Sequence, residues 1–226
     1  MTRLAIEADA RRAFDVLRQG GIAILPNDIG YSAIGGSAAA LRRIFEAKRR
    51  PPTKLNAMLG NKEIHRQIHI LDPAQQEIVD TLVLDHDLPL GLIAPARMDH
   101  PLLRDLDPDA IRGSSRDGTI CMLLNAGPFH EAICRLSLAE MHPLFGSSAN
   151  LTQSGTKFRV EDIEPEILGI ADVVIDYGLR KYFTWKASST LLDITTMRVV
   201  RHGSCFEPIA DVLQRQFNIT LPAGQG

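Results

Sequence analysis

Hydrophobic positions along the chain follow two periodicities in turn. Apolar residues recur at helical spacing from Glu7 to Leu17 and stop at Gly20 and Gly21, whereas a short continuous run such as Ile22–Leu25 is typical of a buried strand. This alternation persists almost to the C-terminus. It predicts helices over 7–17, 38–48, 62–70, 73–84, 128–138 and 207–217, and strands over 22–25, 31–34, 56–59, 90–94, 119–124 and 143–147, followed by further mixed elements between 160 and 200.

Helices and strands that alternate without a linker or an internal repeat indicate one α/β domain with a mixed sheet, here spanning residues 1–226. The segment 97–118 is rich in Asp, Pro and Arg, and we expect a long excursion from the domain there. Long loops in compact domains tend to be functional or mobile. Residues 222–226 are expected to fray.

Composition narrows the class of protein. Of 226 residues, 45% are hydrophobic and 23% charged, which is an ordinary globular balance, and the net charge of −2 excludes a protein that binds nucleic acid through its overall field. The first nine residues lack the apolar stretch of a secretory signal, and no window has the roughly 20 apolar residues of a membrane span. Widely spaced Cys121, Cys134 and Cys205 fit reduced thiols. We therefore expect a cytoplasmic protein with no membrane partner.

A cluster of cations follows the second predicted helix. Lys48, Arg49, Arg50 and Lys54 lie within seven residues, beside Pro51 and Pro52, which stiffen the loop. Arginine binds phosphate oxygens in a bidentate manner and lysine acts as a point charge, so this loop is a candidate phosphate site. The alternative is a solvated basic helix end that complements the helix dipole.

Three other segments carry polar groups at strand ends. The stretch 143–155 runs from a strand into small hydroxyl and amide residues whose N–H and O–H groups suit an anion, although an ordinary Ser/Asn turn would have the same composition. The stretch 26–31 follows the first predicted strand, at the end where α/β proteins usually bind ligands. In the stretch 188–203, Arg201 could supply a further phosphate contact.

Together these segments resemble the YrdC/YciO-like family, whose best-known members are threonylcarbamoyl-AMP synthases. The resemblance covers about residues 20–203. Pro26–Tyr31 is a loose match to an early Pro-Thr-Asp/Glu-Thr-x-Tyr-Gly stretch, and Lys48, Arg50, Pro51 and Lys54 match Lys-x-Arg-Pro with a following Lys in full. Ser148, Asn150, Ser154 and Gly155 match Ser-x-Asn with Ser-Gly. Ser189–Asp193 match Ser-Thr-Val-Val-Asp, and Arg201–Gly203 match Arg-x-Gly.

The resemblance implies a twisted mixed sheet with helices around a concave cationic cavity. It also implies an ATP-dependent nucleotidyltransferase that forms a carbamoyl-adenylate from bicarbonate and an amino acid, as in the t6A modification of tRNA. ATP would be a substrate, with Mg²⁺ carried on its phosphates and no metal site of the protein's own. By this likeness the catalytic residues would be Lys48, Arg50 and Lys54, the nucleotide-binding residues Ser148, Asn150 and Arg201, and the substrate-binding residues Asn27, Asp28, Tyr31 and Ser189.

The departures from the family pattern gather on the amino-acid side. Asn27 and Ile29 replace threonines, Gly91 replaces a hydroxyl residue, and the strand 121–124 has no cation where the family carries an arginine, so that Leu123 borders this side. An unpaired buried carboxylate would cost several kcal/mol. The sequence therefore favours an acceptor other than threonine, an amino acid or a small amine.

Other interpretations of the sequence stay open or fail. A non-catalytic protein of the YciO type could use the same cations to bind tRNA or rRNA, and Tyr182 and Trp185 beside lysines could stack on bases, although covering a hydrophobic edge explains them more simply. His65 and His69 have metal-ligand spacing but no evident third ligand. Asp105, Asp107 and Asp109 lack the glycine and glutamate of a calcium loop.

Overall fold

The computed structural model describes residues 5–51 and 53–222. Pro52 of the predicted Pro-Pro pair and residues 223–226 of the tail predicted to fray lie outside this range. The elements are α1 (Ile6–Arg18), β1 (Ile22–Asn27), β2 (Gly30–Gly35), α2 (Ala38–Ala47), β3 (Ala57–Leu59), α3 (Lys62–Ile68), α4 (Pro73–Asp80), the π-helical turn η1 (Thr81–Asp85), β4 (Leu90–Pro95), α5 (Pro101–Arg104), α6 (Pro108–Arg112), β5 (Ser115–Arg116), β6 (Thr119–Leu124), α7 (Pro128–Ala139), β7 (Phe145–Ser148), the 3₁₀ turn η2 (Val160–Asp162), α8 (Pro165–Leu168), β8 (Val173–Val174), the 3₁₀ turn η3 (Phe183–Trp185), β9 (Leu191–Asp193), β10 (Arg198–Arg201) and α9 (Phe206–Phe217).

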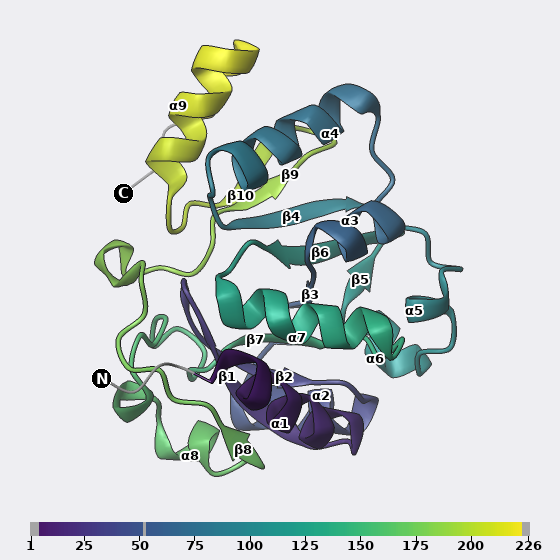
Figure 1. Ribbon diagram of the computed structural model, residues 1–226, viewed down its shortest axis with the longest axis vertical. Coiled ribbons are helices and arrows are strands. Elements are labelled where there is room, and N and C mark those ends of the chain that lie inside the picture. The colour runs from purple at the N-terminus through teal and green to yellow at the C-terminus, as the bar shows by residue number, and fades with distance from the viewer. Residues whose placement is uncertain (1–4, 52, 223–226) are drawn as a thin grey trace.

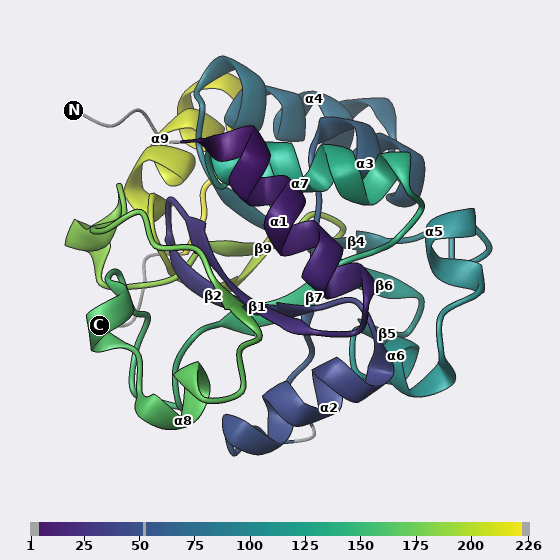
Figure 2. The same cartoon turned by 60° about the horizontal axis from the view of Figure 1, so that its bottom comes forward.

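A twisted mixed sheet crosses the whole molecule (Figure 1). The ten strands of the described residues run in the order β10-β9-β4-β6-β3-β7-β2-β1-β8, with β5 paired to β6 outside this path. The pairs β1·β8, β3·β6 and β4·β9 are parallel, and the other pairs are antiparallel. Figure 2 shows α1, α3, α4 and α7 on one side of the sheet and α2 on the other. The predicted α/β fold with a mixed sheet is confirmed.

The first three elements show how local sequence sets the fold. In α1 the buried side chains Ala10, Ala13, Phe14 and Leu17 follow the i, i+3, i+4, i+7 spacing of one helix face. The strands β1 and β2 then form a tight antiparallel hairpin in which every residue is buried, because the two strands lie inside the sheet with neighbours on both sides.

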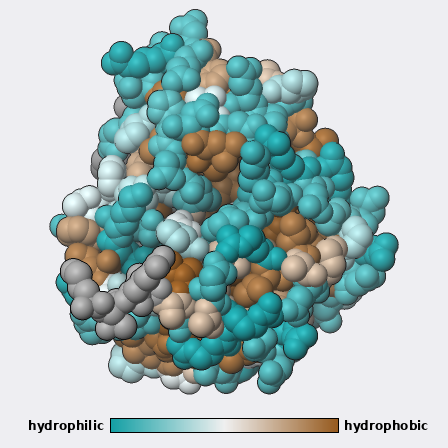
Figure 3. Space-filling model, viewed as in Figure 1, coloured by the Kyte–Doolittle hydropathy of each residue, from teal (hydrophilic) through white to brown (hydrophobic). Residues whose placement is uncertain are grey.

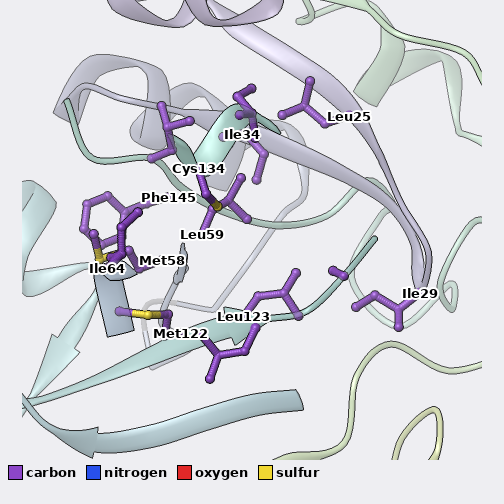
Figure 4. Packing of buried hydrophobic residues seen from close by; sticks show 14 of the residues in the cluster. Leu25, Ile29, Ile34, Met58, Leu59, Ile64, Met122, Leu123, Cys134 and Phe145 are labelled. Carbon is purple, nitrogen blue, oxygen red and sulfur yellow. The ribbon is translucent and has the colours of Figure 1, made fainter. Parts of the chain in front are cut away.

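The hydrophobic core extends to both sides of the sheet (Figure 2): Ala40, Leu41 and Ile44 of α2 belong to it on one side, and residues under α1, α3, α4 and α7 belong to it on the other. In Figure 4, Met58, Ile64, Met122 and Phe145 come together there from three strands and α3. The outer surface over these helices is mostly hydrophilic, with small separate hydrophobic patches (Figure 3). None of the described helices has the length and apolar character required to cross a membrane.

Two predictions of local structure are wrong in detail. The helix predicted to reach residue 70 ends at Ile68, because His69 turns to an extended conformation and the Arg97 guanidinium donates to the carbonyls of Gln67 and His69 at 2.9 and 3.0 Å. The predicted 97–118 excursion is not irregular. It contains α5, α6 and β5, and each of its helices begins with a proline that follows a capping side chain.

Candidate functional site

A row of paired residues leads across four strands to the cationic region. Arg201 of β10 pairs with Leu191 of β9, Leu191 with Gly91 of β4, and Gly91 with Leu123 of β6. Directly paired residues carry their side chains on the same face of a sheet. Cys121, two residues before Leu123, therefore shares this face, which we call the open face.

The two faces of this part of the sheet differ in burial. The alternate residues Leu90, Leu92 and Met122 point away from the open face and are fully buried under the helices. On the open face, Ile93 and Cys121 are only half-buried. The open face is thus the less buried face of these strands at Ile93 and Cys121, while Gly91 and Leu123 on the same face are buried.

Arg50 comes to the open face from the loop after α2. Its guanidinium donates to the Leu55 carbonyl and lies 5.2 Å from the centre of the Phe45 ring. Burial, followed by the positive charge of Arg201, lowers the pKa of Arg50 to about 10. Both arginines also act on Cys121, whose thiol pKa is raised to about 11 by burial against the opposing effect of the two cations. Arg50 and Arg201 therefore lie near enough to Cys121 for their charges to act on its thiol.

Arg201 is held in place by Ser189. Its Nε and Nη2 donate to the Ser189 carbonyl at 3.1 and 2.9 Å. Ser189 is buried, and a Cβ atom added at Gly91 would lie 3.0 Å from its Oγ. A side chain at position 91 would therefore be in tight contact with Ser189 and Leu191, and glycine avoids this crowding.

Lys48 lies next to Arg50 but is buried. Its Nζ donates to the carbonyl of Ser148 and, at 2.6 Å, to that of Asn150. Burial, followed by the charge of Arg50, lowers the pKa of Lys48 to about 7. The predicted cation cluster and the predicted Ser-x-Asn segment thus meet through direct hydrogen bonds, although they are 100 residues apart in the sequence.

Ser148 and Asn150 contact each other in the same loop. The Ser148 hydroxyl donates to the Asn150 Oδ1, and the Asn150 Nδ2 donates to the Leu151 carbonyl at 2.5 Å. Ser148 pairs with Ser32 in the sheet, and the Ser32 Oγ accepts a hydrogen bond from Asn27 Nδ2 at 2.7 Å. This polar chain connects the predicted nucleotide-binding residues to the predicted substrate-binding Asn27.

At the turn between β1 and β2, Asp28 and Tyr31 are engaged within the protein, whereas the buried Asn27 Oδ1 accepts no hydrogen bond from the described residues. Asp28 forms an ion pair of 3.0 Å with Arg180, and their side chains are 13% and 11% exposed, so the pair is largely removed from water. Burial raises the pKa of Asp28, and Arg180 opposes this shift. The Tyr31 hydroxyl lies 2.9 Å from both Asp176 Oδ1 and the Gly178 carbonyl and accepts from the Tyr177 N–H at 3.0 Å.

The sequence patterns did not identify Arg180 as a residue of the candidate site. Its Nε also donates to the Asn27 carbonyl at 3.0 Å, so it contacts two of the predicted substrate-binding residues. No motif marks it, because it lies in an irregular segment between β8 and η3. The one signal is a lone arginine beside the aromatic stretch that contains Tyr182 and Trp185.

The remaining candidates lie apart from this cluster or are engaged elsewhere. Lys54 is exposed to solvent. His65 and His69 are buried, with their Nδ1 atoms 2.9 Å apart, and His69 Nε2 lies 3.2 Å from the Ile120 carbonyl. Across residues 5–51 and 53–222, no group of three His, Cys, Asp or Glu side chains is arranged to hold a metal ion.

Two surface hollows lie away from the cations. One, of about 580 Å³, is lined by Glu7, Glu131 and Arg135 at the starts of α1 and α7. The other, of about 490 Å³, is lined by Asp105, Asp107 and the start of α2. Acidic side chains border both hollows, and the arginine in the first is already paired with its glutamates. Their charge does not suit a polyanionic ligand.

A match to a family model identifies the family of this chain. The model of the Sua5/YciO/YrdC family, described as "Telomere recombination", matches residues 15–203. The chain belongs to this family. No curated protein matches the sequence. The resemblance identified from the motifs at 20–203 is thus confirmed over nearly the same residues.

Solved structures share the fold of this Sua5/YciO/YrdC chain. A hypothetical protein of Streptococcus mutans UA159 is 22% identical with a TM-score of 0.77, and the match covers 96% of this chain and 95% of that one. Sua5 of P. abyssi, in a structure complexed with L-threonine, is 19% identical with a TM-score of 0.71, and 98% of this chain matches 61% of it. YciO of E. coli is 18% identical with a TM-score of 0.64, covering 87% and 90%. This chain thus spans about three fifths of the length of Sua5.

Proposed function

We propose that this protein binds ATP on the open face and forms a carbamoyl-adenylate from bicarbonate and an amine-bearing acceptor. One observation carries the proposal: the charges of Arg50 and Arg201 both act on Cys121, and no carboxylate within residues 5–51 and 53–222 forms an ion pair with either arginine, whose guanidinium groups donate only to backbone carbonyls and Ser189. Two like charges brought together without a counterion repel each other, and an anion between them removes that cost. A triphosphate supplies such an anion.

The proposed chemistry balances with the groups at hand. The acceptor amine and bicarbonate give a carbamate and water, and a carbamate oxygen then attacks the α-phosphorus of ATP. The bond from the α-phosphorus to the oxygen that bridges to the β-phosphate breaks, and pyrophosphate leaves. Arg50 and Arg201 would stabilise the charge on the phosphate oxygens. Mg²⁺ would arrive on the phosphates of ATP, with most of its other ligands being water.

The acceptor follows from the apolar part of the open face. Gly91 and Leu123 continue the row that begins at Arg201, and neither offers a charge to a carboxylate. We propose an acceptor other than threonine, with a small amine favoured over an amino acid because the amine has no carboxylate to be left unpaired. L-Threonine and 1-amino-2-propanol make a matched pair of acceptors, because they differ only by the carboxylate.

ATP/pyrophosphate exchange in the presence of bicarbonate, across a panel of amino acids and amines, tests this function. We expect exchange and an adenylate product that carries label from bicarbonate. Preference for 1-amino-2-propanol over threonine supports the acceptor assignment. Absence of both ATP binding and adduct with every acceptor contradicts the proposed function.

A second candidate function is RNA binding without catalysis, as part of a tRNA- or rRNA-associated role. Phe183 is 44% exposed, and the exposed Lys181 and Lys186 lie on either side of it in sequence. Tyr182 and Trp185, in contrast, pack against each other, and Trp185 Nε1 donates to Glu207 at 3.0 Å. RNA binding that weakens steeply with salt and is lost in Phe183→Ala favours this candidate. ATP binding without RNA binding at modest salt excludes it.

A further inference from the structure

Lys48 ties the end of α2 to the loop 148–152 through both its side chain and its backbone. Its Nζ donates to the carbonyls of Ser148 and Asn150, and its own carbonyl accepts from the Thr152 N–H at 3.1 Å and from the Thr152 hydroxyl at 2.7 Å. Only 3% of Lys48 is exposed. One buried residue thus forms four hydrogen bonds to a loop that carries two of the proposed nucleotide-binding residues.

The geometry of the loop requires a donor at this point. The carbonyl oxygens of Ser148 and Asn150 converge on one position, and two convergent carbonyl dipoles repel each other unless a donor lies between them. A charged ammonium is a much stronger donor than a neutral amine. The protonation state of Lys48 therefore controls how firmly the loop is held.

The charged groups around Lys48 act in opposite directions. Arg50, on the loop that follows α2, disfavours the ammonium, and Glu164, the N-cap residue of α8, favours it. Glu164 is itself engaged with Lys157 Nζ at 2.8 Å and with the Leu151 N–H at 3.2 Å. Burial outweighs both effects and lowers the pKa of Lys48 to about 7. The hydrogen bonds to the carbonyls of Ser148 and Asn150 favour the ammonium against burial, so an anion bound beside Arg50 would shift this balance further toward the charged form.

We propose that Lys48 is a positioning residue of the nucleotide site, whose ammonium fixes the loop 148–152, and that nucleotide binding draws a proton onto this amine. The inference rests on the proposed function for the identity of the ligand, but the hold on the loop does not depend on it. It assigns Lys48 a role different from the direct phosphate contact expected from the sequence. The phosphates would meet Arg50 and Arg201, and Lys48 would act through Ser148 and Asn150.

Amide hydrogen exchange of the free protein tests the hold on the loop. In Lys48→Met the protection factors of the amides from 149 to 154 should fall by about tenfold or more, since a charge-assisted hydrogen bond is lost. Lys62→Met is the matched control, because Lys62 is exposed at the start of α3. In the unaltered protein the same protection should decline as the pH rises through about 7. Equal protection in Lys48→Met and Lys62→Met would overturn the proposal.

ATP titrations between pH 6 and 9 test the proton uptake. Below pH 7 the free protein already carries the proton, and above it the affinity of the unaltered protein should fall by up to about tenfold per pH unit more than that of Lys48→Met. Calorimetry in two buffers of different ionisation enthalpy should show net proton uptake that Lys48→Met lacks. Identical pH dependence in the two proteins would overturn the uptake. If the loop loosens in Lys48→Met but the unaltered protein binds no ATP, the proposed function fails and the hold on the loop stands.

Discussion

The two arginine-bearing regions of the molecule differ in how their charges are balanced. At the β1–β2 turn, Arg180 forms a largely buried ion pair with Asp28 and donates to the Asn27 carbonyl. On the open face, Arg50 and Arg201 donate to the carbonyls of Leu55 and Ser189, and no carboxylate of the described chain forms an ion pair with either. In the first region the arginine has a carboxylate partner within the protein, and in the second region neither arginine has one among the described residues.

This difference separates a structural role from a binding role. A buried pair such as Asp28–Arg180 holds two segments together, and removing one partner leaves the other charged and desolvated. Two neighbouring arginines without a counterion instead make a site that an anion stabilises on binding. We therefore expect substitutions at the turn to change mainly the stability of the fold, and substitutions on the open face to change mainly the proposed nucleotide chemistry.

The largest expected effect comes from breaking the turn. Arg180→Met should lower the free energy of unfolding by about 3 kcal/mol, because Asp28 is left buried and uncompensated. Urea unfolding at pH 7 measures this loss. ATP affinity of the folded variant should change much less than its stability.

The double variant Asp28→Leu with Arg180→Met is the control for that loss. Replacing both members of a buried pair by apolar side chains is often close to neutral, so it should recover much of the stability. If the double variant is as unstable as Arg180→Met, the pair does not explain the effect, and the hydrogen bond from Arg180 to the Asn27 carbonyl becomes the more important contact.

Next in size is the effect of the open-face arginines on activity. Arg50→Met and Arg201→Met should each lower the rate of ATP/pyrophosphate exchange by roughly 100-fold, as expected when one donor to developing charge is removed. Each substitution removes repulsion between like charges but also leaves a carbonyl, of Leu55 or of the buried Ser189, without its donor, so stability should fall by only about 1 kcal/mol. Exchange assays with parallel thermal unfolding measure both. A large loss of stability without loss of exchange would mean that the open-face arginines have a structural role rather than a binding role.

A smaller effect is expected from Tyr31→Phe. The phenol accepts from the Tyr177 N–H and donates to Asp176 or the Gly178 carbonyl, and its loss should lower the free energy of unfolding by about 1–2 kcal/mol. Burial raises the pKa of Tyr31 to about 12, so the hydroxyl stays protonated in this role at neutral pH. Chemical unfolding measures the loss. If Tyr31→Phe keeps full stability but loses acceptor binding, Tyr31 contacts substrate as the sequence predicted.

The sequence predicts most of the regular structure because burial and periodicity coincide. In α1 and in the hairpin β1–β2 each apolar run is also a buried element. The prediction for residues 97–118 was wrong because α5 and α6 are too short to show helical periodicity. Their cap-then-proline starts, His100–Pro101 and Asp107–Pro108, were the readable signal there.

The predicted site depends on contacts that only tertiary structure sets. The motifs predicted one site for Lys48, Arg50, Ser148, Asn150, Ser189 and Arg201, and in the structure hydrogen bonds join Lys48 to Ser148 and Asn150, and Arg201 to Ser189. Whether a charged side chain faces a ligand or its own backbone is not encoded locally. Lys48 turns to two carbonyls, and Asp28 is paired with Arg180, which is 152 residues away in the sequence. Such partners cannot be read from spacing along the chain.

The smallest expected effect concerns Lys54, which shares the loop of Arg50 but is exposed. A single exposed charge is screened by water and salt, so Lys54→Met should change ATP affinity by less than about threefold at physiological ionic strength. Affinities at two salt concentrations measure it, with Arg50→Met as the reference from the same loop. A loss in Lys54→Met as large as that in Arg50→Met, and independent of salt, would mean that Lys54 folds onto the phosphates when ATP binds. The boundary of the cationic site would then extend beyond the open face to the tip of this loop.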